Sequence, residues 1–199
     1  MDNLSSLSDY IKVIDLLTES ECNFILNCIN ENKYITEFYN AKVLDQENGK
    51  SIKSPGRTNT QCFVEIDSPL DSFIYSKVSE GYKKWLSMID HNLAVMWSLH
   101  YRDVDDSGYQ INKYETTEFY DYHIDITRDI NVRRILSMVI YINDDYEGGE
   151  LEFPYNKYKP SKGQAILFPS TWMYPHRSTP VLSGVKYSIV TWFLEKDLE

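Results

Sequence analysis

The half of the chain from Tyr109 onward consists of short β-branched and aromatic segments separated by turns, and this pattern constrains the fold more than any other feature. The clearest segment, 134–143, is rich in β-branched residues and is closed by the turn-forming stretch 144–149. Short strands in succession favour an antiparallel sandwich or barrel over alternating βαβ units. The sequence predicts strands at 109–115, 120–126, 134–143, 150–153, 164–168, 173–176 and 185–194.

The first half of the chain has helical periodicity instead. Thr18 and Glu21 have the spacing of a capping box, and the apolar residues that follow predict a helix at 19–30. A longer amphipathic pattern predicts a helix at 70–89, which places Trp85 in the core. Strands are also expected at 36–44 and 61–66. Helices followed by strands predict an α+β protein whose N-terminal helices brace a double-stranded β-helix, a variant of the jelly roll.

Length and composition fit one globular domain, 1–199, with 42% hydrophobic and 25% charged residues. Within it, 1–106 would supply bracing helices and strands, and 107–199 the catalytic β-helix core. The polar stretch 45–60 is expected to be a loop, either a solvated connection or a mobile lid over a substrate.

Charge and apolar content narrow the range of partners. A net charge of −10 opposes binding to nucleic-acid phosphates. No apolar run reaches the length of a membrane span, and the polar, acidic start of the chain is unlike a signal peptide. We therefore expect a cytoplasmic protein without a nucleic-acid or membrane partner. Three cysteines without metal-ligand spacing, Cys22, Cys28 and Cys62, favour buried reduced thiols.

Three residues in the strand-rich half have the chemistry of a metal site. His123 and Asp125 are two residues apart, so an extended strand would present both side chains on one face. His176 follows Asp125 by 51 residues. Two imidazoles and one carboxylate form the facial triad of non-haem Fe(II) oxygenases, although an isolated His-x-Asp more often makes a structural hydrogen bond. His91 and His100 lack such neighbours and are expected to be structural or surface residues.

A lysine at the start of the last predicted strand adds to this pattern. Lys186 lies ten residues after His176, and its neighbours Val185, Ile189 and Trp192 favour an inward position over the surface position usual for lysine. A buried ammonium group is costly unless an anion meets it. The distal carboxylate of a dicarboxylic co-substrate would be such an anion.

The order and spacing of these motifs resemble those of the 2-oxoglutarate/Fe(II)-dependent dioxygenases, specifically the prolyl 4-hydroxylase branch. The segment 114–125 matches the family pattern Tyr-x2-Gly-x2-Tyr-x2-His-x-Asp, except that Thr117 replaces the glycine. The other matching blocks are 134–143, 147–150, 163–169, His176, Lys186 and Trp192. The triplet 57–59 resembles the start of the family's substrate loop.

The resemblance implies a role for each matched residue. His123, Asp125 and His176 would be the catalytic iron ligands, and Lys186 would pair with the distal carboxylate of 2-oxoglutarate. Tyr114 and Tyr141 would also bind the co-substrate, whereas Leu151 replaces a threonine that some relatives use there. The residues on the substrate side would be Tyr120, Arg134, Trp192 and Arg57, with plain core packing as the alternative for Tyr120 and Trp192. The implied cofactors are Fe(II), 2-oxoglutarate and O2, with ascorbate as a reductant.

Three interpretations of function follow. The first is a procollagen-proline 4-dioxygenase-like hydroxylase that acts on an unactivated C–H bond of peptidyl proline and releases succinate and CO2. The second keeps this chemistry for a free amino acid or other small molecule. A DNA-repair dioxygenase fits less well, because those enzymes have an arginine where Trp192 stands and the acidic charge opposes DNA. The third is a non-catalytic β-helix domain that only binds a partner.

Overall fold

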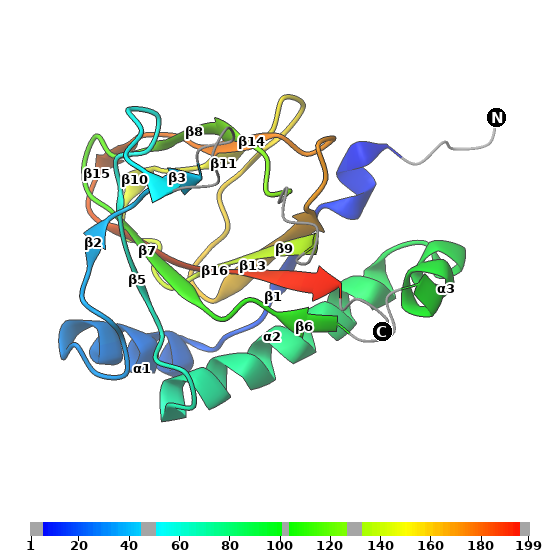
Figure 1. Cartoon of the computed structure of the whole chain (residues 1–199), viewed down its shortest axis with the longest axis horizontal. Helices are drawn as coiled ribbons and strands as arrows, with labels where there is room; N and C mark the ends of the chain where they lie inside the picture. The colour runs from blue at the N-terminus through cyan, green and yellow to red at the C-terminus, as the bar shows by residue number, and fades with distance from the viewer. Residues whose placement is uncertain (1–5, 45–50, 101–103, 127–132, 196–199) are drawn as a thin grey trace.

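Two antiparallel sheets form the body of the computed structural model, which describes residues 6–44, 51–100, 104–126 and 133–195. The two sheets face each other, and the helices cover the outer face of the larger one (Figure 1). This is the α+β architecture with a double-stranded β-helix that the sequence predicts.

The larger sheet contains strands from both the beginning and the end of the described chain. Its order is β1 (Lys12–Asp15), β13 (Gln164–Pro169), β9 (Arg133–Tyr141), β16 (Lys186–Glu195), β7 (Gln110–Tyr114), β5 (Thr60–Phe63) and β2 (Tyr39–Asn40), with β6 (Val104–Asp106) also paired to β16. Because β1 and β5 pair directly with β13 and β7, the two halves of the chain share one sheet.

The smaller sheet carries the other half of the β-helix. Its order is β12 (Lys157–Tyr158), β11 (Leu151–Glu152), β14 (His176–Ser178) and β8 (Tyr120–His123). Two short ribbons complete the strands, β10 (Glu147–Gly148) with β15 (Val181–Ser183), and β3 (Val43–Leu44) with β4 (Ser51–Ile52). The helices are the 3-10 helix η1 (Leu7–Tyr10), α1 (Glu19–Asn30), α2 (Pro69–Met88) and α3 (His91–His100).

Side-chain alternation along β9 divides the interior into two apolar clusters. Leu136, Met138 and Ile140 belong to the cluster beneath the helices, whereas Val139 and Tyr141 belong to the cluster between the two sheets. Successive residues of a strand point to opposite faces. From Ser137 to Tyr141, the odd-numbered positions of β9 therefore face the space enclosed by the sheets; the pairing of β9 with β16 shifts register before this segment.

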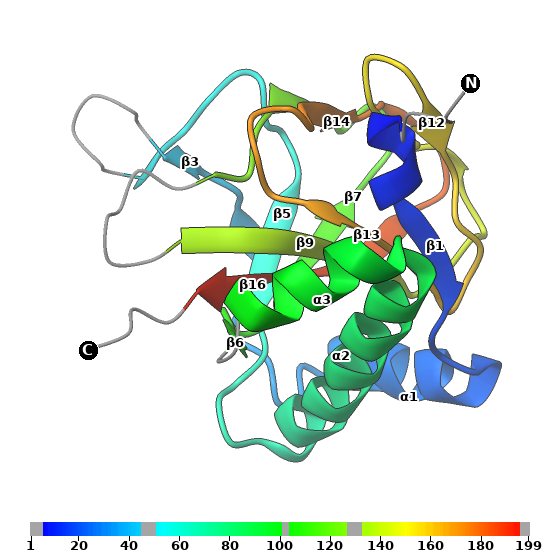
Figure 2. The ribbon, with the colours of Figure 1, turned by 90° about the vertical axis from the view of Figure 1, so that its right-hand side faces the viewer.

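The helices pack closely on the outer face of the larger sheet (Figure 2). The capping box of α1 is present, with Thr18 and Glu21 each bonding the other's backbone. In α2, Gly81 lies so close to the sheet that a β-carbon there would come within 2.7 Å of Met138 Cε. Trp85 is fully buried, as predicted, and its Nε1 donates to Tyr10 O at 3.0 Å. No helix in the described ranges combines the length and apolar character of a membrane span.

Several predicted elements differ from the structure. Helix α3 was not expected; Asp90 Oδ1 accepts from the backbone of its first turn, and Trp97 packs edge-on against Trp85. The strand predicted at 36–44 is split into β2 and β3. The strand predicted at 173–176 begins at His176 instead of ending there, because the preceding Pro175 has no backbone N–H for a ladder. Of the predicted loop 45–60, residues 45–50 lie outside the described residues.

The cysteine prediction is confirmed in the structure. Cys22, Cys28 and Cys62 are all buried and free. Burial raises the pKa of Cys22 to about 11 and that of Cys62 to about 12. These thiols are therefore protonated at neutral pH and behave as small apolar side chains.

Thr117 occupies a backbone position that favours glycine, with φ of +75° in the turn after β7. A β-branched residue with positive φ is strained by about 1–3 kcal/mol, and glycine would regain part of this despite its greater chain entropy. We expect Thr117→Gly to stabilise the fold by about 1 kcal/mol, which would raise Tm by about 2–4 °C in thermal denaturation. Thr116→Gly is the matched control, because Thr116 is not among the positive-φ residues, and it should lower Tm.

Candidate metal centre and co-substrate pocket

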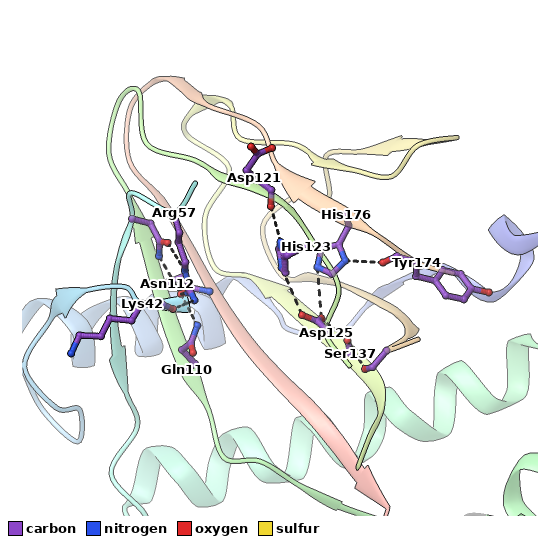
Figure 3. A network of polar contacts seen from close by, with 12 residues as sticks. Lys42, Arg57, Gln110, Asn112, Asp121, His123, Asp125, Ser137, Tyr174 and His176 are labelled. Atoms are coloured by element: carbon purple, nitrogen blue, oxygen red, sulfur yellow. Dashed lines mark hydrogen bonds and ion pairs between the residues drawn. The ribbon is translucent and has the colours of Figure 1, made fainter. Parts of the chain in front are cut away.

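The three predicted metal ligands converge between β8 and β14. These strands pair with His176 opposite His123, and Asp125 follows just after β8. Nε2 of each histidine lies 3.7 Å from one carboxylate oxygen of Asp125 (Figure 3). The three candidate ligand atoms all lie within 4.8 Å of one another. Such spacing would allow a single ion to contact all three.

Hydrogen bonds to backbone carbonyls fix how the two imidazoles present their nitrogens. Nδ1 of His123 lies 2.8 Å from Asp121 O, and Nδ1 of His176 lies 3.1 Å from Tyr174 O (Figure 3). A carbonyl oxygen can only accept, so each Nδ1 carries a hydrogen, and each Nε2 is the nitrogen that faces the Asp125 carboxylate. Metal-binding histidines are typically oriented in this way.

The charge states of the cluster also suit a divalent cation. Burial, followed by the adjacent His176, lowers the pKa of His123, so its imidazole is neutral. Burial alone would raise the pKa of Asp125, but His176, His123 and the Ser137 hydroxyl outweigh it and lower that pKa. Two imidazoles and one carboxylate form the donor set of an Fe(II) facial triad, so the residues present fit this metal.

Lys186 is buried beside the triad, and we call the residues around its side chain, Tyr114, Tyr141, Gly149 and Ser178, the Lys186 pocket. The Lys186 side chain is 3% exposed, and Nζ donates to Gly149 O at 2.7 Å and to Ser178 Oγ at 3.0 Å. The Tyr114 and Tyr141 ring centroids lie 5.0 and 5.2 Å from Nζ. Ser178 is two residues from His176 on β14, so the two side chains face the same way and connect the pocket to the triad.

The pocket lacks an anion among the described residues. No described carboxylate lies within ion-pair distance of Lys186, and burial lowers the pKa of Lys186 to about 7. The buried hydroxyls of Tyr141 and Tyr146 have no hydrogen-bond partner in the described part of the chain. Buried polar groups are normally paired. An ammonium group and two unpaired phenols therefore fit the distal carboxylate of a dicarboxylic co-substrate.

The four residues predicted for the substrate side lie around the triad. The Tyr120 ring stacks on His123 with 3.6 Å between centroids, and the Arg57 guanidinium lies 4.4 Å from the Tyr120 centroid. Arg57 donates to Asn112 Oδ1 at 3.2 Å. On the adjoining strands β9 and β16, Cζ of Arg134 lies 3.6 Å from the ring centroid of Trp192. Trp192 also lowers the pKa of Asp125. The structure thus gathers every residue that the resemblance assigned to the site.

Some residues of the site were not predicted from the sequence. Tyr146 and Ser178 border the Lys186 pocket, and Asn112 holds Arg57. Alternation from His176 could have indicated Ser178, which is two residues further along the strand. Tyr146 lies in a turn, where no periodicity applies. Leu151 is 5% exposed within an apolar cluster, so this position supplies no hydroxyl.

Sequence comparison finds a matching family model and relatives among the prolyl 4-hydroxylases. The family model of the 2OG-Fe(II) oxygenase superfamily matches residues 109–194. Prolyl 4-hydroxylase 1 of Arabidopsis thaliana is 26% identical over 209 residues, covering 92% of this chain. The chain spans 61–67% of the length of three such Arabidopsis relatives.

Solved structures share the fold. A viral collagen prolyl hydroxylase from Paramecium Bursaria Chlorella virus-1, in its 2OG complex, aligns with a TM-score of 0.66 at 21% identity, covering 93% of this chain and 96% of that one. A Trichoplax adhaerens prolyl hydroxylase, in complex with a hypoxia inducible factor peptide fragment, aligns at 0.67 and 18% identity, covering 94% and 84%. At these identities the likeness establishes the architecture.

Proposed function

We propose that this chain is a 2-oxoglutarate- and Fe(II)-dependent dioxygenase that hydroxylates peptidyl proline, a member of the 2OG-Fe(II) oxygenase superfamily, whose family model matches residues 109–194. The observation that carries this proposal is the buried Lys186 pocket beside a His–Asp–His cluster. A metal triad alone would also suit other metalloproteins. The buried Lys186 amine, which has no described carboxylate partner, and the two unpaired phenols suit a dicarboxylic co-substrate.

The residues of the chain divide the catalytic work between them. When bound, Fe(II) with 2-oxoglutarate and O2 supplies the oxidising power to hydroxylate an unactivated C–H bond, with succinate and CO2 as co-products. His123, Asp125 and His176 hold the metal. Lys186, Tyr114 and Tyr141 hold the distal carboxylate of the co-substrate. Phe153 and Phe168 pack against His176 and exclude water from that side.

The substrate side supports a peptide. Arg57 stacks on Tyr120 and Arg134 stacks on Trp192, and these two pairs would border a peptide with guanidinium donors for its carbonyls and apolar ring surface for a proline. The Arabidopsis relative is named a prolyl 4-hydroxylase, and the Trichoplax enzyme was solved with a peptide. The same two guanidiniums would also fit the free carboxylate of an amino acid, which keeps that class as the second candidate.

A 2-oxoglutarate decarboxylation assay with added Fe(II) tests the function. Proline-rich peptides, free amino acids and methylated DNA would be compared, with and without ascorbate. Stimulation by peptide, with a product about 16 Da heavier at proline, is the expected result. Stimulation by free amino acids alone would replace the peptide substrate, and absence of any iron-dependent turnover would reject the dioxygenase.

Tyr146 is expected to contribute to co-substrate binding. A β-carbon on Gly149 would lie 3.1 Å from Lys186 Cδ and 3.2 Å from Tyr146 Cε2, so these two side chains border the same point. The Tyr146 hydroxyl is buried and unpaired among the described residues. We expect Tyr146→Phe to raise the KM for 2-oxoglutarate by roughly five-fold, the worth of one buried hydrogen bond, without changing metal affinity. An unchanged KM in steady-state assays would show that the phenol only packs.

A further inference from the structure

Two buried serines lie behind the carboxylate of Asp125. Ser137 on β9 is 0% exposed and its Oγ donates to Asp125 Oδ2 at 2.7 Å (Figure 3). Ser170, which follows β13 and is 1% exposed, has its Oγ 2.7 Å from Ser137 Oγ. An ionised carboxylate can only accept and Ser137 has one hydroxyl hydrogen. Ser170 must therefore donate to Ser137, and the two hydroxyls form a directed chain that ends on Asp125.

Backbone hydrogen bonds around Ser170 hold this pair of hydroxyls in place. The Ser170 N–H donates to Ile135 O at 3.1 Å, which fixes the residue to β9. Four residues later, Tyr174 O accepts from Nδ1 of His176. The segment 170–174 thus supports two of the three candidate metal ligands, one through the serine hydroxyls and one through a carbonyl.

We propose that Ser137 and Ser170 are positioning residues that hold the Asp125 carboxylate in its metal-binding orientation. The proposal rests on the proposed function only in that the triad binds a divalent metal. The last torsion of an aspartate is broad, so a carboxylate without a partner samples many orientations. A hydrogen bond to one oxygen removes this freedom, and the donation from Ser170 strengthens it in the dry interior. Partners of metal ligands typically change metal affinity by about 10–100-fold.

Metal titration without co-substrate tests this directly. Co(II) binding would be followed by its visible absorbance, and Mn(II) binding by calorimetry. We expect Ser137→Ala to weaken both metals by about ten-fold and to change the Co(II) spectrum. Ser170→Ala should weaken them by about three-fold. Because Ser170 acts only through Ser137, the double variant should bind no more weakly than Ser137→Ala alone.

Thr191→Val is the matched control. Thr191 lies on β16 next to Trp192, the residue that pairs with Ser137, and its buried hydroxyl has no partner in the described part of the chain. Successive residues face opposite sides of the sheet, so this variant removes a buried hydroxyl from the other face and should keep wild-type metal affinity.

Each outcome separates this inference from the proposed function. Wild-type affinity and an unchanged Co(II) spectrum in Ser137→Ala would overturn the positioning role while leaving the dioxygenase intact. Additive losses in the double variant would overturn the directed chain. If Ser137→Ala does not fold, Ser170→Ala alone tests the proposal. Wild-type metal affinity in Ser170→Ala would then reject a role for the chain of serine hydroxyls. Absence of metal binding by the wild-type protein would remove both proposals.

Discussion

Replacing His176 with alanine is expected to abolish iron-dependent turnover of 2-oxoglutarate, with a loss of at least about 1,000-fold, because two remaining ligands cannot hold Fe(II) in a catalytic geometry. His176 is 4% exposed, pairs across the sheet with His123 and lies 3.7 Å from Asp125 Oδ2. The measurement is succinate or CO2 release under saturating Fe(II), together with the Co(II) absorbance of the triad.

His91→Ala is the matched histidine control for this experiment. His91 begins α3 and is exposed, outside the metal cluster. Its replacement should leave both turnover and metal binding unchanged. Turnover retained by His176→Ala, with His91→Ala equally active, would refute the assignment of the metal site. If His176→Ala lowers the stability of the fold, adding Thr117→Gly to that variant would offset part of the loss.

Periodicity and ordered spacing made much of the fold predictable. The capping box at Thr18 predicted α1 at its observed bounds, because local side-chain to backbone bonds are encoded locally. The β-branched run 134–143 predicted β9, whose inner face carries Val139 and Tyr141. The convergence of His123 with His176 followed from the resemblance of the motifs, since no local rule brings residues 53 positions apart together.

The remaining features depend on contacts that sequence periodicity does not encode. Helix α3 has no clear amphipathic pattern and is held by the packing of Trp97 on Trp85. Tyr146 reaches the Lys186 pocket from a turn, where side-chain direction has no period. The bond between Ser137 and Ser170 joins β9 to the residue that follows β13, and a serine has no sequence signal for supporting a metal ligand.

Lys186→Ala is expected to weaken 2-oxoglutarate binding by about 30-fold or more, or about 2 kcal/mol, while metal affinity changes by less than about three-fold. Co-substrate and metal affinity should respond differently because different residues provide them. The Lys186 amine contacts Gly149 O and Ser178 Oγ, whereas the metal donors come from the His–Asp–His triad. Lys186→Met retains the apolar stem and controls for packing. Equal losses of co-substrate and metal affinity would show that Lys186 is structural.

The same lysine predicts a pH dependence of co-substrate binding. Burial lowers the pKa of Lys186 to about 7, so above that pH the free protein holds it mainly as the neutral amine. A carboxylate bound next to it favours the ammonium form, so binding at about pH 8 should take up close to one proton, and affinity should fall as pH rises above about 7. Calorimetry in buffers of different ionisation enthalpy measures this uptake. It should vanish in Lys186→Ala and persist in Lys113→Ala, whose lysine pairs with Glu115 on the opposite face of the sheet. Proton uptake that survives the loss of Lys186 would assign it to another group and refute this role.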